Sequence, residues 1–271
     1  MSHNKDTSLR YQPWQESEAG SVGLELCHTL LRRLFSGWPR RARSMLVMGA
    51  GGGDFIESLW ESGFDVTGQE SDSAFLAKAR ERMGARAEFV LSAPDHLPFD
   101  DCAFDYTVVA AAYEFWENPE AVLREINRLT CRGIILIFPN EWSLFGLECR
   151  MRKRNPLCAS ARPLLQNPKE VWTTARRVFG KKKMAWASVL PASTWTWKRS
   201  PLFRLLNTPV CPLPLGAFAG LRIDFGPLLT GTPLLLKATD PVTSAEYAGG
   251  STARLKQRTP AKKTGRADSS C

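Results

Sequence analysis

The sequence predicts a doubly wound α/β fold built on a mostly parallel sheet. Two observations support this fold class. Short apolar runs of strand length alternate with helical apolar patterns from residue 44 to residue 139, and a glycine-rich turn joins the first run to the first helical pattern. Because strands that alternate with helices are usually parallel and carry the helices on both faces of their sheet, we expect one α/β core over residues 44–139.

The expected elements of this core follow one another in strict order. Apolar residues at every third or fourth position indicate the helices, and compact apolar runs indicate the strands. The expected strands cover 44–48, 64–68, 87–91, 105–110 and 133–139, and the expected helices cover 54–62, 73–83 and 119–129.

The chain before this core is polar at first but carries large aromatic side chains. Tyr11 and Trp14 stand in the polar leader, and a helical apolar pattern follows over residues 22–35 until Trp38-Pro39 ends it. Residues 1–43 are therefore interpreted as an N-terminal lid and helix.

After residue 139 the alternation stops, and residues 140–214 are interpreted as a basic, tryptophan-rich inserted cap. Eleven basic residues stand against two acidic ones between residues 148 and 183. They indicate either a solvated surface or a face that attracts anions. Five tryptophans of the cap are expected to form a small hydrophobic core, to line a pocket for a flat or apolar molecule, or both. They are Trp142, Trp172, Trp186, Trp195 and Trp197.

The C-terminal part of the chain changes character again. Residues 215–239 are expected to supply the last two strands of the sheet, near 215–225 and 233–238. Residues 240–271 are rich in Gly, Ser, Thr, Lys and Arg, with few apolar residues, which predicts a disordered basic tail.

Composition narrows the class of protein. With 271 residues, of which 44% are hydrophobic, the chain can build one sizeable core with a small appended part. Its apolar runs are shorter than the roughly 20 residues that span a bilayer, and its first residues lack the features of a secretory signal, so we expect a cytoplasmic protein. The seven cysteines form no CxxC pair, which argues against a metal site and a disulfide framework.

The glycine-rich turn is the first candidate for chemistry. Gly49, Gly51, Gly52 and Gly53 lie between the first strand and the first helix, at the carboxyl end of the sheet, where open α/β folds bind ligands. Glycines let backbone N–H groups approach a ligand closely, and the N-terminus of the following helix favours a carboxylate.

An acid at the end of the second strand adds to this turn. Glu70 stands seventeen residues after Gly53, where a carboxylate can accept hydrogen bonds from ribose hydroxyls, so a nucleoside-bearing cofactor is indicated. A dinucleotide fits less well, because the third glycine of the GxGxxG pattern, counted from Gly49, falls on Asp54.

A loop before the fourth strand makes the pattern more specific. Residues 97–105 read LPFDDCAFD, and the helix that follows the fourth strand includes AVLREINRL at 121–129. Together with the glycine turn and Glu70, these segments resemble the type-11 class I methyltransferases, whose loop has the form LPF-D-x-x-FD and is here one residue longer. The leader YQPWQESEAG at 11–20 is similar to that of one branch. The resemblance covers most of residues 11–145 and implies a Rossmann-like, seven-stranded methyltransferase fold.

The resemblance also implies which residues bind the cofactor, S-adenosyl-L-methionine. Residues 49–51 are expected at its methionine part, Glu70 at its ribose, and residues 93–95 at its adenine, with the leader aromatics as a lid and Ala110 near the sulfonium. The full implied set is Tyr11, Trp14, Gly49, Ala50, Gly51, Gly53, Glu70, Ser71, Ala93, Pro94, Asp95 and Ala110.

Two residues depart from the family pattern. Val47 replaces an acid that many relatives carry, and Ala93 replaces an aspartate that commonly contacts adenine. Each missing hydrogen bond weakens binding by about 1 kcal/mol, so the site is expected to be weaker than in those relatives, or degenerate.

Methyl transfer from a sulfonium needs mainly alignment of the acceptor, so a dedicated base is not required. If the acceptor must lose a proton, the candidate catalytic residues are Tyr113, Glu114 and Asn140, with His96 as an outside candidate. Each of the four has a structural reading too, in packing, in a turn or on an exposed loop.

The favoured function is methyl transfer to an unidentified small molecule held under the cap. One alternative is a nucleic-acid methyltransferase that uses the basic segment, although Ala110-Ala111-Ala112-Tyr113 stands where such enzymes carry an NPPY-type tetrapeptide. Another is a non-catalytic protein that binds S-adenosylmethionine. Peripheral contact of the basic cap with a membrane stays open as well.

Overall fold

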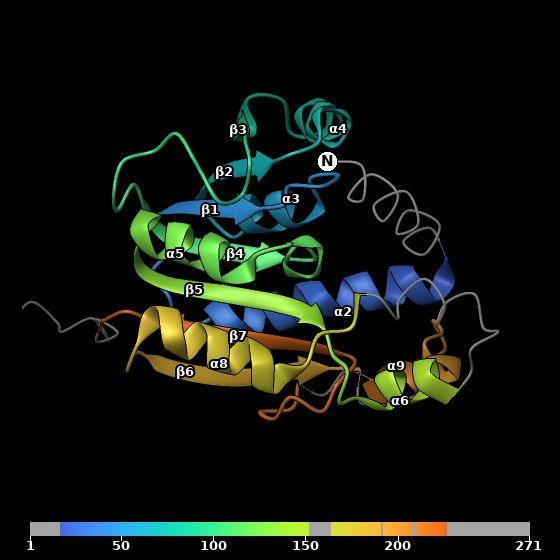
Figure 1. The fold of residues 1–271 in the computed structure, drawn as a ribbon. Helices are drawn as coiled ribbons and strands as arrows, with labels where there is room; N and C mark the ends of the chain where they lie inside the picture. The colour runs from blue at the N-terminus through green and yellow to red at the C-terminus, as the bar shows by residue number, and fades with distance from the viewer. Residues whose placement is uncertain (1–16, 152–163, 191, 208–209, 227–271) are drawn as a thin grey trace, which may run out of the picture. The chain divides into compact units, whose positions relative to one another are not determined.

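The computed structural model describes residues 17–151, 164–190, 192–207 and 210–226, all within one compact unit (Figure 1). They form a sheet of seven strands in the order β3-β2-β1-β4-β5-β7-β6. The strands are β1 Ser44–Met48, β2 Asp65–Glu70, β3 Glu88–Leu91, β4 Phe104–Ala110, β5 Thr130–Pro139, β6 Lys183–Val189 and β7 Phe218–Asp224. The first five strands are parallel to one another, and β7 is antiparallel to both β5 and β6. The prediction of a doubly wound, mostly parallel, seven-stranded sheet is confirmed.

Helices cover both faces of the sheet (Figure 1). The α-helices are α2 Glu18–Phe35, α3 Asp54–Glu61, α4 Ser73–Met83, α5 Pro119–Leu129, α6 Leu144–Met151, α8 Pro168–Phe179 and α9 Pro201–Asn207. Three short 3₁₀ helices accompany them: η1 Gly84–Arg86, η2 Tyr113–Phe115 and η4 Thr194–Thr196. Helices α2, α3 and α4 contribute to the core on one face, and α5 and α8 to the core on the other.

Side-chain caps fix where several helices begin. Ser17 accepts a hydrogen bond from Gly20 N at the start of α2, and Asp72 accepts one from Ala74 N at the start of α4. Asn118 and Asn167 cap α5 and α8, each followed by a proline in the first turn. These residues satisfy backbone N–H groups that have no partner inside the helix, so each helix starts at the edge of the sheet.

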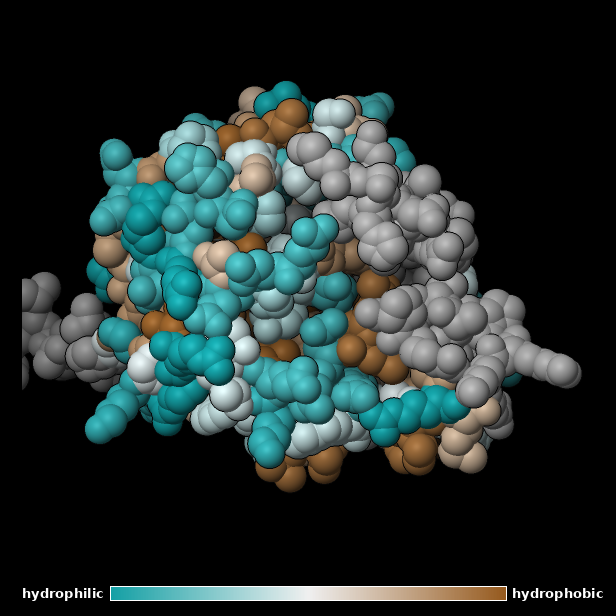
Figure 2. All heavy atoms as spheres, in the orientation of Figure 1, coloured by the Kyte–Doolittle hydropathy of each residue, from teal (hydrophilic) through white to brown (hydrophobic). Residues whose placement is uncertain are grey.

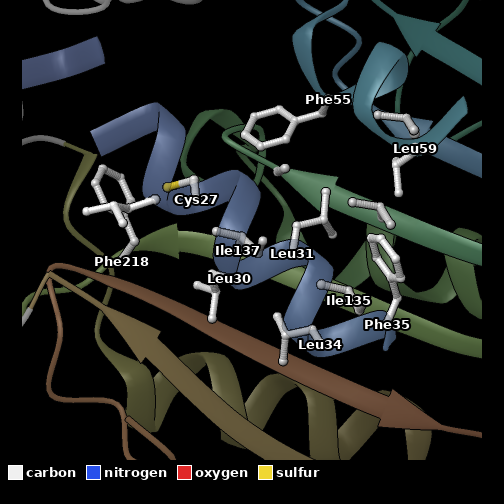
Figure 3. Packing of buried hydrophobic residues seen from close by; sticks show 14 of the residues in the cluster. Cys27, Leu30, Leu31, Leu34, Phe35, Phe55, Leu59, Ile135, Ile137 and Phe218 are labelled. Atoms are coloured by element: carbon white, nitrogen blue, oxygen red, sulfur yellow. The ribbon is translucent and has the colours of Figure 1, made fainter. Parts of the chain in front are cut away.

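Helix α2 lies across one face of the sheet and forms much of its core. Figure 3 shows its side chains Leu30 and Leu34 pointing toward β7, and Leu31 on the side of the helix nearer α3. Close packing between α2 and the sheet requires a glycine in β7, since a Cβ on Gly220 would lie 2.5 Å from a methyl carbon of Leu34. This helix therefore forms a wall over the carboxyl half of β5.

The segment after β5 differs from its prediction. Residues 140–214 were expected to form an inserted cap, but they contain β6, which pairs with β7 along its whole length and completes the sheet. The second half of the segment is therefore partly sheet. Of the two late strands expected in 215–239, the first is β7, and the second, at 233–238, lies outside the described residues, as do Tyr11, Trp14 and the tail 240–271.

The five tryptophans do not gather into one core. Trp172 and Trp186 stack on each other, with ring centroids 5.7 Å apart, on the α5 and α8 face. Trp197 is buried on the opposite face beside Phe145, whereas Trp142 and Trp195 are about half exposed. The expected single core is wrong, because β6 passes through the segment and separates its residues between the two faces.

Candidate active site

The glycine turn has the open geometry that close ligand approach needs. Gly49 and Gly51 have φ angles of +72° and +52°, in the left-handed region that favours glycine. A Cβ on Gly49 would lie 2.5 Å from the Cβ of Ala112, so this position must be glycine for packing alone. A Cβ on Gly51 would meet no atom of the described residues within 4 Å. The turn is therefore closely packed at Gly49, against Ala112, and has free space at Gly51.

Glu70 is tied directly to this turn. Its Oε2 accepts a hydrogen bond of 2.9 Å from Gly51 N, and its Oε1 accepts bonds of 2.8 Å from Ser71 N and 3.2 Å from Asp72 N. The structure thus brings the predicted residues at the ends of β1 and β2 together. Because Oε2 takes only one of these bonds, it retains a lone pair for a further donor such as a ribose hydroxyl.

Gln69 is a residue of this site that the sequence did not single out. It is buried, its Oε1 accepts a bond of 3.3 Å from Gly49 N, and its Nε2 donates a bond of 2.7 Å to Ser92 O. It links the carboxyl ends of β1, β2 and β3. Its only signal in the sequence is its place beside Glu70 at the end of a strand.

The loop after β3 begins beside Glu70. Ser92 N donates a bond of 3.1 Å to Glu70 O, and this loop continues into the predicted adenine residues Ala93, Pro94 and Asp95. The hydroxyl of Ser92 is buried and has no hydrogen-bond partner in the described part of the chain. Together with Glu70 Oε2 and the space at Gly51, this hydroxyl gives the site the polar groups and the room that a nucleoside fits.

Val47 shows why the turn lacks one polar anchor. Its side chain is only 1% exposed and belongs to the core on the face of α2 and α3. The position is therefore part of the packing here and offers no polar group to the turn.

A pocket lies at the carboxyl end of β4, on the face covered by α2. Its empty volume is about 280 Å³, and its walls come from α2, α3, the turn after β4 and the ends of β5 and β7. Apart from Glu114, the lining is apolar or a thiol and includes Leu24, Cys27, Phe55, Ala111 and Phe218. Figure 3 shows Cys27 and Ile137 close to one another, with Phe55 and Phe218 on either side. Ala111 has a φ of +55°, which is rare for a residue with a Cβ and marks a tight turn.

Glu114 is the charged group of this pocket. Both of its carboxyl oxygens are buried, and within the described residues neither has a hydrogen-bond partner in another side chain or main chain. Burial raises the pKa of Glu114 to about 8, and its own backbone N–H offsets part of this rise. The carboxyl group is therefore largely protonated at neutral pH.

The other catalytic candidates lie elsewhere. Tyr113 points to the opposite face of the sheet, beside Trp116 and Phe138, and burial raises its pKa to about 12. The side-chain amide of Asn140 donates two bonds of 2.8 Å to the carbonyls of Pro214 and Gly216, and its oxygen accepts a bond of 2.9 Å from Trp142 N. His96 lies on the exposed loop after β3. Among these four residues, Glu114 alone lines the pocket.

Comparison with known proteins finds a family model that matches part of the chain. Residues 46–138 match the family model of the type-11 methyltransferases, described as "Methyltransferase domain". No curated protein sequence matches the chain.

Several solved structures share the fold. A structure from Thermotoga maritima, described as a SAM-dependent methyltransferase and possible histamine N-methyltransferase, is 20% identical, with a TM-score of 0.60 over 80% of this chain and 94% of that chain. A plantazolicin methyltransferase in complex with SAH is 12% identical, with a TM-score of 0.55 over 81% and 90%. The magnesium protoporphyrin IX methyltransferase of Synechocystis with bound SAM is 11% identical, with a TM-score of 0.53 over 80% and 90%. At these identities the likeness shows the fold.

Proposed function

We propose that this chain, a class I S-adenosylmethionine-dependent methyltransferase whose type-11 methyltransferase domain covers residues 46–138, transfers the methyl group to a small molecule. The observation that carries the proposal is the direct link between the glycine turn and Glu70, beside a small pocket at the end of β4. A small, mostly apolar pocket with one polar group suits part of a small molecule better than a macromolecular chain.

In this proposal S-adenosyl-L-methionine lies along the carboxyl ends of β1 to β4. When bound, it supplies a methyl group that is already activated by its sulfonium. Gly51 offers the space for its methionine part, Glu70 Oε2 accepts a hydrogen bond from the ribose, and the loop at Ala93–Asp95 borders the adenine, with the hydroxyl of Ser92 beside it. Gly49, Ala50, Gly53, Ser71 and Ala110 line the same edge, and Tyr11 and Trp14, outside the described residues, are proposed as the lid.

Calorimetry with S-adenosylhomocysteine tests the donor site directly. We expect one molecule to bind per chain with a micromolar dissociation constant, and repeated turnover of S-adenosylmethionine with a suitable acceptor. Absence of heat with both molecules at millimolar concentration would reject the proposed function. Binding without turnover on any extracted acceptor would favour the non-catalytic alternative.

Nucleic acid is the weaker alternative for the acceptor. The basic helix α8 packs against α5, on the sheet face opposite the pocket, and several of its charges are already used. Arg177 pairs with Glu120 at 2.7 Å, and Arg176 donates to the carbonyls of Gly180 and Lys182. A steep salt dependence in a filter-binding assay is the result that would favour this alternative.

Contact with an anionic membrane surface is supported by an independent observation. Ten of the twelve exposed large hydrophobic side chains in the described residues lie between Trp142 and Leu215, mainly on α6, η4 and α9. The same stretch of sequence has fourteen Lys and Arg residues against two acidic ones. Figure 1 draws α6 and α9 at one corner, and in Figure 2 brown side chains gather at the lower edge below this place.

Sedimentation with vesicles tests this membrane contact. Exposed apolar side chains flanked by basic ones bind anionic lipid surfaces through both effects. We expect the protein to sediment with vesicles that contain phosphatidylserine and to stay in solution with pure phosphatidylcholine. The substitution Leu205→Asp, at a side chain that is 76% exposed, should reduce binding several-fold. Equal sedimentation of the variant and the wild type would contradict the contact. Among the described residues, no helix is long and apolar enough to cross a bilayer.

A further inference from the structure

The carboxyl group of Glu114 faces a pocket that is otherwise apolar. The walls around it are hydrocarbon and aromatic side chains from four elements, with the Cys27 thiol from α2. Neither oxygen has a partner elsewhere in the described residues, which is unusual because buried carboxyl groups are normally paired or hydrogen-bonded. Within the described residues, the structure therefore presents two acceptor atoms without a partner at the wall of this pocket.

Few other titratable groups influence this carboxyl group. On α2, burial and then the neighbouring Glu114 raise the pKa of the Cys27 thiol, and burial lowers the pKa of His28, which stacks on Phe55 at 4.6 Å. On α3, Asp54 is bound to Arg82. The parts of β5 and β7 that line the pocket, including Ile137 and Phe218, are apolar. No cation among the described residues neutralises Glu114, which leaves its carboxyl oxygens available to a ligand.

We propose that this pocket binds the amino group of a small, apolar amine, that Glu114 is the partner of this group, and that the amine nitrogen is the methyl acceptor. The inference rests on the proposed function, because it names the substrate class of the same site. An amine supplies N–H donors and, once protonated, the positively charged partner that a buried carboxylate needs.

The chemistry of the transfer balances with these groups. The lone pair of the neutral nitrogen forms the bond to the methyl carbon as the carbon–sulfur bond breaks, and the electron pair of that bond stays on sulfur. The nitrogen becomes neutral before the transfer by giving one proton to the carboxylate of Glu114. After the transfer the methylated nitrogen keeps the positive charge, and the proton on Glu114 passes to solvent. A pKa of about 8 is suited to this exchange, since it lies close to that of a partly desolvated amine. An alcohol is too weak an acid to lose its proton to this group, and an anionic acceptor would be desolvated here without a positive charge to pair with.

The affinity for the amine should depend on pH, because binding changes the number of protons that the two groups hold. At pH 6 both Glu114 and a free amine, whose pKa is about 10 like that of lysine, are protonated, but the bound pair holds one proton fewer. Binding therefore releases about one proton, and affinity should rise about tenfold per pH unit until the carboxyl group ionises near pH 8. Above that pH the affinity should level off.

Calorimetry on the full chain saturated with S-adenosylhomocysteine tests this proposal. The probes are 2-phenylethylamine, 2-phenylethanol and 3-phenylpropionate, which differ in their polar end. The variant Glu114→Gln removes the ionisable group with little change in shape. Glu117→Gln is the matched control, because Glu117 lies three residues further on the same loop and is exposed. Each titration is run in two buffers of different ionisation enthalpy at pH 6 and pH 7.

The expected result is that only the amine binds, with release of about one proton, and that Glu114→Gln weakens it at least tenfold and removes both the proton release and the pH dependence. Glu117→Gln should behave as the wild type. The proposal is overturned if no amine binding is seen, if the alcohol binds as well as the amine, or if Glu114→Gln binds the amine unchanged. It is also overturned if this variant loses affinity for S-adenosylhomocysteine to the same extent, because the carboxyl group then serves the donor. Failure of S-adenosylhomocysteine to bind the wild type would instead reject the proposed function.

Discussion

Replacing Gly51 by leucine is expected to abolish binding of S-adenosylhomocysteine while the protein stays folded. Among the described residues, no atom lies within 4 Å of a Cβ built on this glycine, so a side chain fits there without a clash with that part of the protein. That space is where the methionine part of the donor is proposed to lie. Leucine would fill it and keep the ligand away from the backbone N–H groups of the turn. We expect the dissociation constant to rise at least about 100-fold, which corresponds to about 2.8 kcal/mol.

Gly84 provides a matched control for this substitution. Its φ is +57°, close to the +52° of Gly51, and a Cβ there would also meet nothing within 4 Å. The backbone at Gly84, with φ +57° and ψ −130°, is a conformation that suits glycine almost exclusively, so Gly84→Leu should lose about 1–3 kcal/mol of stability and is a demanding control for backbone strain. Gly84 lies at the far end of α4, away from the glycine turn, so Gly84→Leu should bind S-adenosylhomocysteine as the wild type does. Equal affinities in the two variants would show that the donor does not lie at Gly51.

The sequence predicts the first five strands and the helices between them because each carries a strong, uninterrupted apolar pattern. It misses β6 for a physical reason. This strand begins with Lys183 at the edge of the sheet, directly after Lys181 and Lys182, and its first half is partly exposed. Edge strands often carry lysines, which prevent pairing with another chain, and these lysines look like part of a basic surface in the sequence.

The sequence likewise predicts one part of the candidate site and not the other. The glycine turn and Glu70 are readable because neighbouring parallel strands place their carboxyl ends at one edge. The environment of Glu114 is not readable, because its pocket is closed by Leu24 and Cys27 from a helix about ninety positions earlier in the chain. Tyr113 and Glu114 are adjacent in sequence, yet only the turn after β4 decides that they point to opposite faces. Side-chain direction in a 3₁₀ turn has no periodic signal in the sequence.

The substitution Trp38→Ala is expected to cause a large loss of stability, about 3–5 kcal/mol in the free energy of unfolding. Trp38 is 3% exposed and stacks on Tyr106 of β4, with ring centroids 4.2 Å apart and planes 10° apart. Its indole N–H donates a bond of 2.9 Å to Asp224 at the end of β7. The sheet is shaped to receive it, since a Cβ on Gly133 of β5 would lie 2.7 Å from the indole ring. Alanine would leave a cavity and remove the indole donor of a buried carboxylate.

Denaturant unfolding with Trp195→Ala as the control separates this effect from the mere loss of a tryptophan. Trp195 is 60% exposed, so its removal should change the free energy of unfolding by no more than about 0.5 kcal/mol. Trp38→Phe should lie between the two, because phenylalanine keeps the stacking on Tyr106 and loses the bond to Asp224. Similar stabilities of Trp38→Ala and Trp195→Ala would contradict the role of Trp38 as an anchor.

Because Trp38 follows directly on α2, the helix that carries Leu24 and Cys27, losing this anchor should also loosen the wall over Glu114. Amine binding in Trp38→Ala should therefore fall even under conditions in which the variant is still folded.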